Sequence, residues 1–148
     1  MDVLKEIRNS RIDLNAKLKP QPIAMSYGVD WEGNPSCVFG EGDYSVINGL
    51  SKSKKSFFKS MAVASYIAGD ESDLYKPFKT HRSGDKIILD IDTEQSDFHA
   101  QRTFKRVSRV TGSPYKYHYC YSIRSYSALE RLELLETLIK QYGKDIGC

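Results

Sequence analysis

The chain has 148 residues, of which 40% are hydrophobic and 28% are charged, and this composition is typical of one soluble globular domain. It excludes a collagen, a disordered chain and a two-domain enzyme. The 22 basic and 19 acidic residues give a net charge of +3, which is too small to indicate a nucleic-acid partner by itself. Because no run of 18 apolar residues exists and residues 1–14 are too charged for a secretory signal, we expect a cytoplasmic protein without a membrane span.

The N-terminal part combines a predicted helix, a linker and a hairpin. Apolar residues at helical spacing predict a short amphipathic helix within residues 1–14. The stretch 19–22 contains two prolines, which lack an N–H and favour an extended linker. Short apolar pieces on either side of turn-forming residues 30–35 predict a peripheral hairpin. Residues 1–40 are therefore predicted to form a helix, a linker and a hairpin outside the core.

Strands and helices are predicted to alternate over residues 41–148. A β-prone run, an apolar helical face and a polar surface excursion come first, at residues 43–48, 54–68 and 69–86. A strand, a basic helix, a tyrosine-rich strand and a strongly periodic helix follow, at residues 87–92, 98–110, 115–123 and 127–142. This alternation favours an α/β layered fold with a mostly parallel sheet.

The segment between the first of these strands and its helix matches a phosphate-binding loop. Residues 49–56 fit the pattern G-x-x-x-x-G-K-[ST] except that Lys54 replaces the second glycine. In such a loop, backbone N–H groups at the helix N-terminus bind phosphate oxygens, Lys55 contacts the terminal phosphates and the Ser56 hydroxyl binds Mg²⁺. The predicted nucleotide contacts are Gly49, Leu50, Ser51, Lys52, Ser53, Lys54, Lys55 and Ser56.

Two readings of this loop remain open. In the first, the loop binds phosphate, and if position 54 requires a positive φ, Lys54 carries strain of about 1 to 3 kcal/mol. In the alternative reading, the loop is only a solvated basic patch made by four lysines, Lys52, Lys54, Lys55 and Lys59.

Three carboxylates alternate at the end of the strand at residues 87–92: Asp90, Asp92 and Glu94. Carboxylates at the C-terminal edge of a parallel strand lie where α/β folds place their sites. Glu94, the last of the three, is the predicted base that polarises the attacking water. In the alternative, Asp92 and Glu94 cap the following helix, whose N-terminus favours negative charge.

Together, Gly49-x4-Lys54-Lys55-Ser56 and the run 88–96 resemble the RecA-like ATPases, in particular the RepA, DnaB and RadA helicase-type members of phages and mobile elements. The resemblance implies a three-layer RecA-like P-loop core with a mostly parallel sheet over residues 41–148. It implies ATP and Mg²⁺ as ligands, catalytic roles for Glu94 and Lys55, and metal contacts from Ser56 and Asp92. It also implies an arginine against the base or a phosphate, for which the candidates are Arg102 and Arg106.

These ATPases carry a later hydrophobic strand ending in a Mg²⁺-binding aspartate. Here that strand would only begin at residues 145–148, so we expect an incomplete core from the N-terminal part of a longer, homo-oligomeric ATPase that handles DNA. The isolated chain is then expected to bind ATP, whereas hydrolysis would need the missing part. Two other functions stay open: a metal-dependent phosphotransfer enzyme using Asp90 and Asp92, and a non-catalytic module that binds nucleic-acid phosphates through the basic helix.

The remaining polar patterns carry less information. The chain contains three widely spaced cysteines without a CxxC pair, Cys37, Cys120 and Cys148, which predicts reduced thiols and no zinc site. Surface or ordinary hydrogen-bonding roles are expected of the three isolated histidines, His81, His99 and His118. Four alternating tyrosines share one strand face, where packing beneath a helix is favoured over base stacking: Tyr115, Tyr117, Tyr119 and Tyr121.

Overall fold

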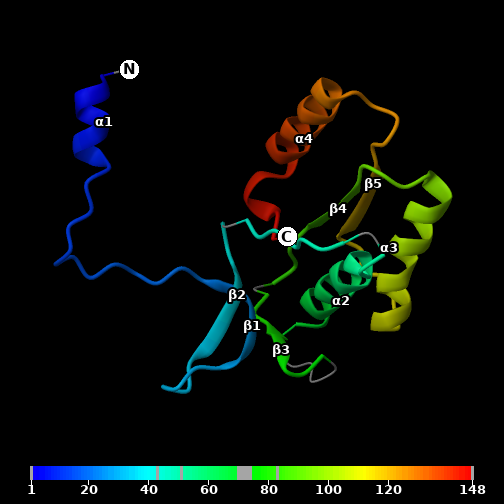
Figure 1. Cartoon of the computed structure of the whole chain (residues 1–148), viewed down its shortest axis with the longest axis horizontal. Helices are drawn as coiled ribbons and strands as arrows, with labels where there is room; N and C mark the ends of the chain where they lie inside the picture. The colour runs from blue at the N-terminus through cyan, green and yellow to red at the C-terminus, as the bar shows by residue number, and fades with distance from the viewer. Residues whose placement is uncertain (1, 43, 51, 70–74, 83, 148) are drawn as a thin grey trace.

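The computed structural model describes residues 2–42, 44–50, 52–69, 75–82 and 84–147. Within these residues the chain forms two small sheets with helices beside them, and one N-terminal helix that lies apart from both sheets (Figure 1). In chain order the elements are α1 (Val3–Asn9), β1 (Ile23–Val29), β2 (Pro35–Gly40), α2 (Lys55–Ala68), β3 (Phe78–Thr80), β4 (Ile88–Asp92), α3 (Asp97–Thr111), β5 (His118–Ser122), α4 (Ala128–Tyr142) and the 3-10 turn η1 (Gly143–Asp145).

The predicted three-layer RecA-like core with a mostly parallel sheet is wrong. One sheet is antiparallel with the strand order β2-β1-β3, and a separate parallel sheet contains only β4 and β5. The strand predicted at residues 43–48 is absent from its described part, which has no regular secondary structure over residues 44–48, while Asp43 lies outside the described residues. Tyr44 and Val46 are 92% and 81% exposed, so this run buries no apolar face that would hold it in a sheet.

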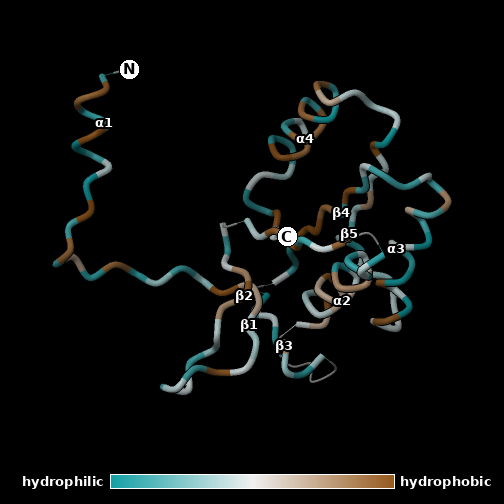
Figure 2. The backbone as a smooth tube through the Cα atoms, viewed as in Figure 1, coloured by the Kyte–Doolittle hydropathy of each residue, from teal (hydrophilic) through white to brown (hydrophobic). Residues whose placement is uncertain are grey.

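The core lies between α2, α3 and the parallel sheet. Its buried side chains come from α2, β4 and α3 and include Val63, Ala64, Tyr66, Ile88 and Val107. Figure 2 shows that α3 is largely hydrophilic apart from its few apolar positions, as expected of a helix with one face on the core and the other in water.

The parallel sheet has two different faces. Along β4, the side chains of Ile88, Asp90 and Asp92 are buried, whereas the alternate positions are only half-buried. Since side chains alternate along a strand, the two aspartates share the face that packs on α2. On the opposite face of β5, Tyr119 meets Tyr142 of α4 with the ring centroids 5.3 Å apart. The predicted packing of a strand tyrosine beneath a helix is confirmed at this position.

The predicted hairpin is confirmed as the antiparallel pair β1 and β2. A third strand, β3, lies inside the segment that was predicted to be a surface excursion, and it pairs with β1 through Tyr27 opposite Phe78. The Thr80 side chain is fully buried and donates a hydrogen bond of 2.7 Å to the Ser65 carbonyl of α2. β3 therefore joins the antiparallel sheet to the central helix.

The two ends of the described chain differ in their packing. α1 buries no side chain and lies at the far end of an extended segment (Figure 1). Near the C-terminus, Ile146 forms a parallel bridge with Ile87, with hydrogen bonds of 2.9 Å on either side of it. No helix of the described chain is long and apolar enough to cross a membrane.

Candidate functional site

The described residues that precede α2 form a tight turn, and the predicted contact Ser51 lies outside the described residues. Lys52 and Lys54 both have left-handed backbone, with φ of 65° and 63°, which residues other than glycine seldom adopt. The Ser53 N–H donates to the Leu50 carbonyl at 3.2 Å. A Cβ on Gly49 would lie 2.8 Å from the Ser53 hydroxyl oxygen, so a larger residue here would force the Ser53 side chain to move. Lys54 thus has the conformation that a glycine would adopt with ease at the same place.

Lys55 folds back over this turn. Its Nζ donates to the carbonyl oxygens of Gly49 and Leu50 at 2.7 and 3.0 Å. The side chain is exposed, and these two carbonyls provide only neutral acceptors for its charge. An anion that entered the loop would offer the ammonium a stronger, charge-assisted hydrogen bond.

The first turn of α2 leaves donors available beside that ammonium. Lys54 is the N-cap of the helix and supplies no side-chain hydrogen bond to it. The N–H groups of Phe57 and Phe58 both donate to the Lys54 carbonyl, whereas those of Lys55 and Ser56 find no acceptor among the described residues. Free N–H groups at the positive end of a helix dipole favour the binding of an anion.

A basic hollow of about 290 Å³ adjoins this helix end. Its charged lining consists of three arginines of α3 at helical spacing, Arg102, Arg106 and Arg109, and Ser56 lies on the opposite wall. Arg106 donates to the Ser56 carbonyl and the Ser60 hydroxyl at 3.2 and 3.3 Å. Its guanidinium also lies 3.9 Å from the centre of the Phe57 ring. Arg106 therefore attaches α3 to the first turn of α2, whereas Arg102 and Arg109 are exposed.

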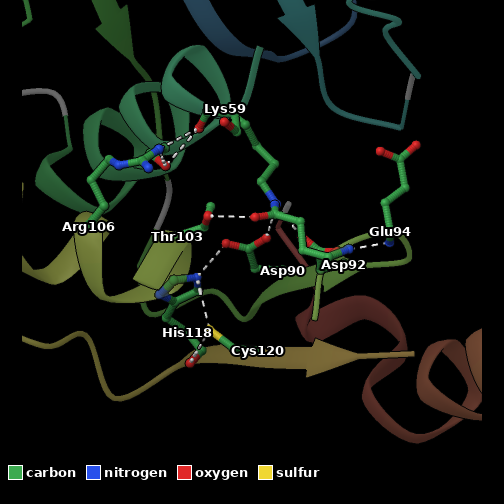
Figure 3. A network of polar contacts seen from close by, with 11 residues as sticks. Lys59, Asp90, Asp92, Glu94, Thr103, Arg106, His118 and Cys120 are labelled. Carbon is green, nitrogen blue, oxygen red and sulfur yellow. Dashed lines mark hydrogen bonds and ion pairs between the residues drawn. The ribbon is translucent and has the colours of Figure 1, made fainter. Parts of the chain in front are cut away.

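The structure separates the roles of Asp92 and Glu94. Asp92 is buried and accepts hydrogen bonds from the N–H groups of Glu94 and Gln95 and from the Gln95 amide, at 3.0, 2.7 and 2.7 Å. These bonds shape the turn between β4 and α3, in partial agreement with the alternative in which the carboxylates cap this region. The Glu94 carboxylate is exposed and points away from Asp90 (Figure 3). Within the described chain it forms no hydrogen bond or ion pair.

A second polar cluster lies on the α2 face of the parallel sheet. Asp90 accepts a hydrogen bond from Lys59 Nζ at 2.7 Å through one carboxylate oxygen, and its other oxygen lies 3.1 Å from His118 Nε2. Cys120 Sγ lies 3.4 Å from the same His118 nitrogen. Figure 3 shows these side chains converging from α2, β4 and β5.

The environment of this cluster sets its charge. Burial favours the neutral form of Asp90, but hydrogen bonds from His118 and Lys59 and their positive charges outweigh it, so the pKa of Asp90 lies below its ordinary value. Cys120 is exposed as a residue, but desolvation of its thiol beside the sheet raises the thiol pKa to about 12, and the charge of Asp90 adds to this rise. Without another cation the thiol therefore stays protonated at neutral pH and is a poor nucleophile.

The geometry also excludes a nucleophilic relay. In a cysteine-histidine-acid relay the thiol contacts one imidazole nitrogen and the acid contacts the other. Here Cys120 and Asp90 both approach Nε2 of His118. Acyl transfer by this cluster is thus not supported.

Sequence alone does not reveal this cluster, because His118 is isolated along the chain and Cys120 belongs to no metal-binding pattern. The available signal was the i, i+2 spacing of the two side chains on one strand face. The partner strand and its register, which place Cys120 opposite Asp90, follow only from the structure.

The chain matches no family model, no curated protein and no solved structure.

Proposed function

We propose that this protein binds the polyphosphate of ATP with Mg²⁺ at residues 49–56. The observation that carries the proposal is the left-handed turn at Lys54, after which the N–H groups of Lys55 and Ser56 have no acceptor among the described residues, while the Lys55 ammonium contacts the loop carbonyls. This arrangement supplies both the positive helix end and the mobile cation that phosphate binding requires.

Each nearby side chain has a proposed role. Lys55 exchanges its carbonyl contacts for phosphate oxygens, and the Ser56 hydroxyl holds Mg²⁺. Arg102 contacts the base or a phosphate from the hollow, and Arg106 keeps the wall in place. Glu94, whose side chain is exposed, is the proposed base for hydrolysis. Asp92 can bind the metal only if it loses its hydrogen bonds from Gln95, so we propose Ser56 as the main metal ligand and Asp92 as a secondary one.

The use of ATP for DNA handling in a phage or mobile element rests on the sequence resemblance alone. The observed sheets differ from the core which that resemblance implied. We therefore propose ATP binding as the primary function, and ATP-driven DNA handling by an oligomer as its use.

The test is equilibrium binding of ATP to the full chain with Mg²⁺, by calorimetry. Lys55→Ala is expected to weaken binding about 10- to 100-fold, because a charge-assisted hydrogen bond contributes about 1.5 to 3 kcal/mol. Lys140→Ala, which removes an equal charge from the exposed face of α4, is the matched control and should leave the affinity unchanged. Inorganic triphosphate should compete with ATP, whereas adenosine should not.

Two results would contradict the proposal: no binding of ATP or triphosphate by the unaltered chain, or equal affinities for the chain and Lys55→Ala. The rival phosphotransfer enzyme has less support, since Asp90 and Asp92 both accept hydrogen bonds from neighbouring side chains.

A nucleic-acid-binding module is the second candidate, and the three arginines of α3 in one hollow favour it. It predicts DNA binding that weakens steeply with salt, and a smaller salt dependence after Arg102→Ala or Arg109→Ala. If DNA binds in this way while ATP does not bind, this second function replaces the first.

A further inference from the structure

We infer that Asp90, His118 and Cys120 form a binding site for a transition-metal ion, with Zn²⁺ as the best match. The site is independent of the proposed ATP function, because none of its three ligands belongs to the loop at residues 49–56. Their ligand atoms, Asp90 Oδ2, His118 Nε2 and Cys120 Sγ, lie within 4.8 Å of one another.

The spacing of these atoms agrees with coordination to one ion. Zinc bonds of about 2.3 Å to sulfur and about 2.1 Å to nitrogen and oxygen place tetrahedral ligand atoms about 3.4 to 3.6 Å apart. The observed separations are 3.1 Å between Oδ2 and Nε2 and 3.4 Å between Nε2 and Sγ. These two separations lie within a few tenths of an ångström of the tetrahedral values, and the separation between the Asp90 oxygen and the Cys120 sulfur is below 4.8 Å.

Strand pairing and side-chain alternation place all three ligands on one face of the parallel sheet. Asp90 and Cys120 are register partners on the parallel strands β4 and β5, and His118 precedes Cys120 by two residues on the same face. The side chains of Asp90 and His118 are only 2% and 5% exposed. Ligands held by a sheet pay little conformational entropy when they bind an ion.

A cation could replace the hydrogen bonds that now join these three groups. His118 Nε2 has the Asp90 carboxylate at 3.1 Å and the Cys120 sulfur at 3.4 Å, and the thiol also lies 4.0 Å from the His118 carbonyl. A metal ion accepts electron pairs from all three atoms at once. The other carboxylate oxygen of Asp90 remains bonded to Lys59, which holds this ligand from outside in the manner of outer-shell partners at known metal sites.

The mixture of donors selects the metal. Mg²⁺ and Ca²⁺ prefer oxygen ligands alone, whereas one sulfur, one nitrogen and one oxygen suit Zn²⁺. Cys120 is exposed, so a fourth ligand, water, can enter on its side. Three protein ligands and one open position are the pattern of zinc sites that exchange or activate a ligand.

The test uses the full chain, stripped with a chelator and then dialysed against Zn²⁺ alone, with bound zinc measured by atomic emission. One zinc per chain is expected for the unaltered protein. Cys120→Ser should weaken binding by more than about 100-fold, since even outer-shell partners contribute about 10- to 100-fold. This ligand is exposed, so the variant should keep its far-UV circular dichroism spectrum.

Two cysteine variants are the matched controls. Cys37→Ser changes an exposed thiol on β2, and Cys148→Ser changes a thiol outside the described residues; both should keep one zinc. With Co²⁺ as a probe, the unaltered chain should show thiolate-to-cobalt absorption that is absent from Cys120→Ser. His118→Gln provides a second ligand variant and should also lose the metal.

The inference is overturned if the unaltered chain binds no zinc, or if Cys120→Ser and His118→Gln bind it as well as the unaltered chain does. It is also overturned if either control loses the metal, because the ion would then belong to another thiol. Nucleotide binding is measured separately, so failure of this site leaves the ATP proposal standing, and the reverse also holds.

Discussion

Lys54 occupies a backbone conformation that favours glycine. For a residue with a Cβ the left-handed region costs about 1 to 2 kcal/mol, and Lys54 forms no side-chain hydrogen bond to the helix that begins after it. Such strain persists where the surrounding structure or a ligand fixes it, and it is found often at binding sites. The strain at Lys54 therefore supports the proposal that this loop is a phosphate-binding site.

Replacing Lys54 separates the backbone effect from the loss of its charge. Lys54→Gly and Lys54→Ala both remove the ammonium, but only glycine accepts φ of 63° without strain. We expect Lys54→Gly to be more stable than Lys54→Ala by about 0.5 to 1 kcal/mol, after the greater freedom of glycine in the unfolded chain is subtracted. Urea denaturation measures the difference, and an alanine variant of equal or greater stability would show that the position is not strained.

Arg106 has structural contacts that the resemblance did not suggest. Because its guanidinium lies over Phe57 and donates to the Ser56 carbonyl, we expect Arg106→Ala to lower the free energy of unfolding by about 2 kcal/mol. Arg109→Ala is the control, since Arg109 is exposed and forms no hydrogen bond in the described chain; its effect should stay within about 0.5 kcal/mol. Equal losses of stability for Arg106→Ala and Arg109→Ala in urea denaturation would contradict the structural role of Arg106.

At the scale of elements, α4 begins with a capping box. The Ser127 hydroxyl accepts from the Glu130 N–H, and the Glu130 carboxylate accepts from the Ser127 N–H at 2.8 Å. These interactions with the Ser127 side chain and backbone lower the pKa of Glu130 below its ordinary value of 4.5. A lowered pKa means that the folded chain binds the proton less tightly than the unfolded chain does.

The pH dependence of stability follows from this sign. The contribution of ionised Glu130 is complete well above pH 4.5 and is lost as the pH falls through the lowered pKa. The stability difference between the unaltered chain and Glu130→Gln, measured by thermal unfolding, should be constant near neutrality. Below about pH 4.5 the unaltered chain should lose stability relative to Glu130→Gln. Glu133→Gln changes an exposed carboxylate one turn later and should show no such shift. A parallel shift in both variants would rule out the capping box as the cause.

Periodicity predicted the helices well. The expected ranges 54–68, 98–110 and 127–142 correspond within two residues to α2, α3 and α4, because apolar residues recur at helical spacing in each of them. In α4 this apolar face buries no residue, and Leu129, Leu132 and Ile139 stay exposed. The strands were harder to predict from the sequence. β3 has only three residues and exists because it pairs with β1, and residues 43–48 resemble a strand in composition but bury no face.

At the scale of the whole molecule, α2 connects the two sheets. It packs on the parallel sheet through Val63 and Ala64, and its Ser65 carbonyl accepts the hydrogen bond from Thr80 of β3. The sequence did not predict this arrangement, since alternating strands and helices also suit a single parallel sheet. Strand pairing over long sequence distances, which decides between the two, leaves little trace in local patterns.

Thr80 tests that connection. Thr80→Val keeps the volume but removes the donor, so we expect a loss of about 1 kcal/mol, and Thr80→Ala should lose about 1 kcal/mol more through the cavity it leaves. Thr137→Val, at an exposed position on α4 with the same kind of hydroxyl-to-carbonyl bond, should change the stability by less than about 0.5 kcal/mol. Urea denaturation followed by circular dichroism gives all three values; similar losses for Thr80→Val and Thr137→Val would mean that the contact between β3 and α2 contributes little.

The candidate sites were predictable to different degrees. The loop at residues 49–56 is contiguous, so its spacing could be recognised in the sequence. The cluster of Asp90, His118 and Cys120 joins two strands, and no local pattern specifies their register.

Every described residue before Ile23 is exposed, and this fact has a practical consequence for handling the protein. Trypsin should remove this segment by cutting after Arg11 and Lys17, whereas from Gln21 onward the chain is held by its contact with the Glu41 carbonyl and by β1. Mass spectrometry should find a new N-terminus at Leu18. Such a trimmed fragment would be the natural starting material for crystallisation.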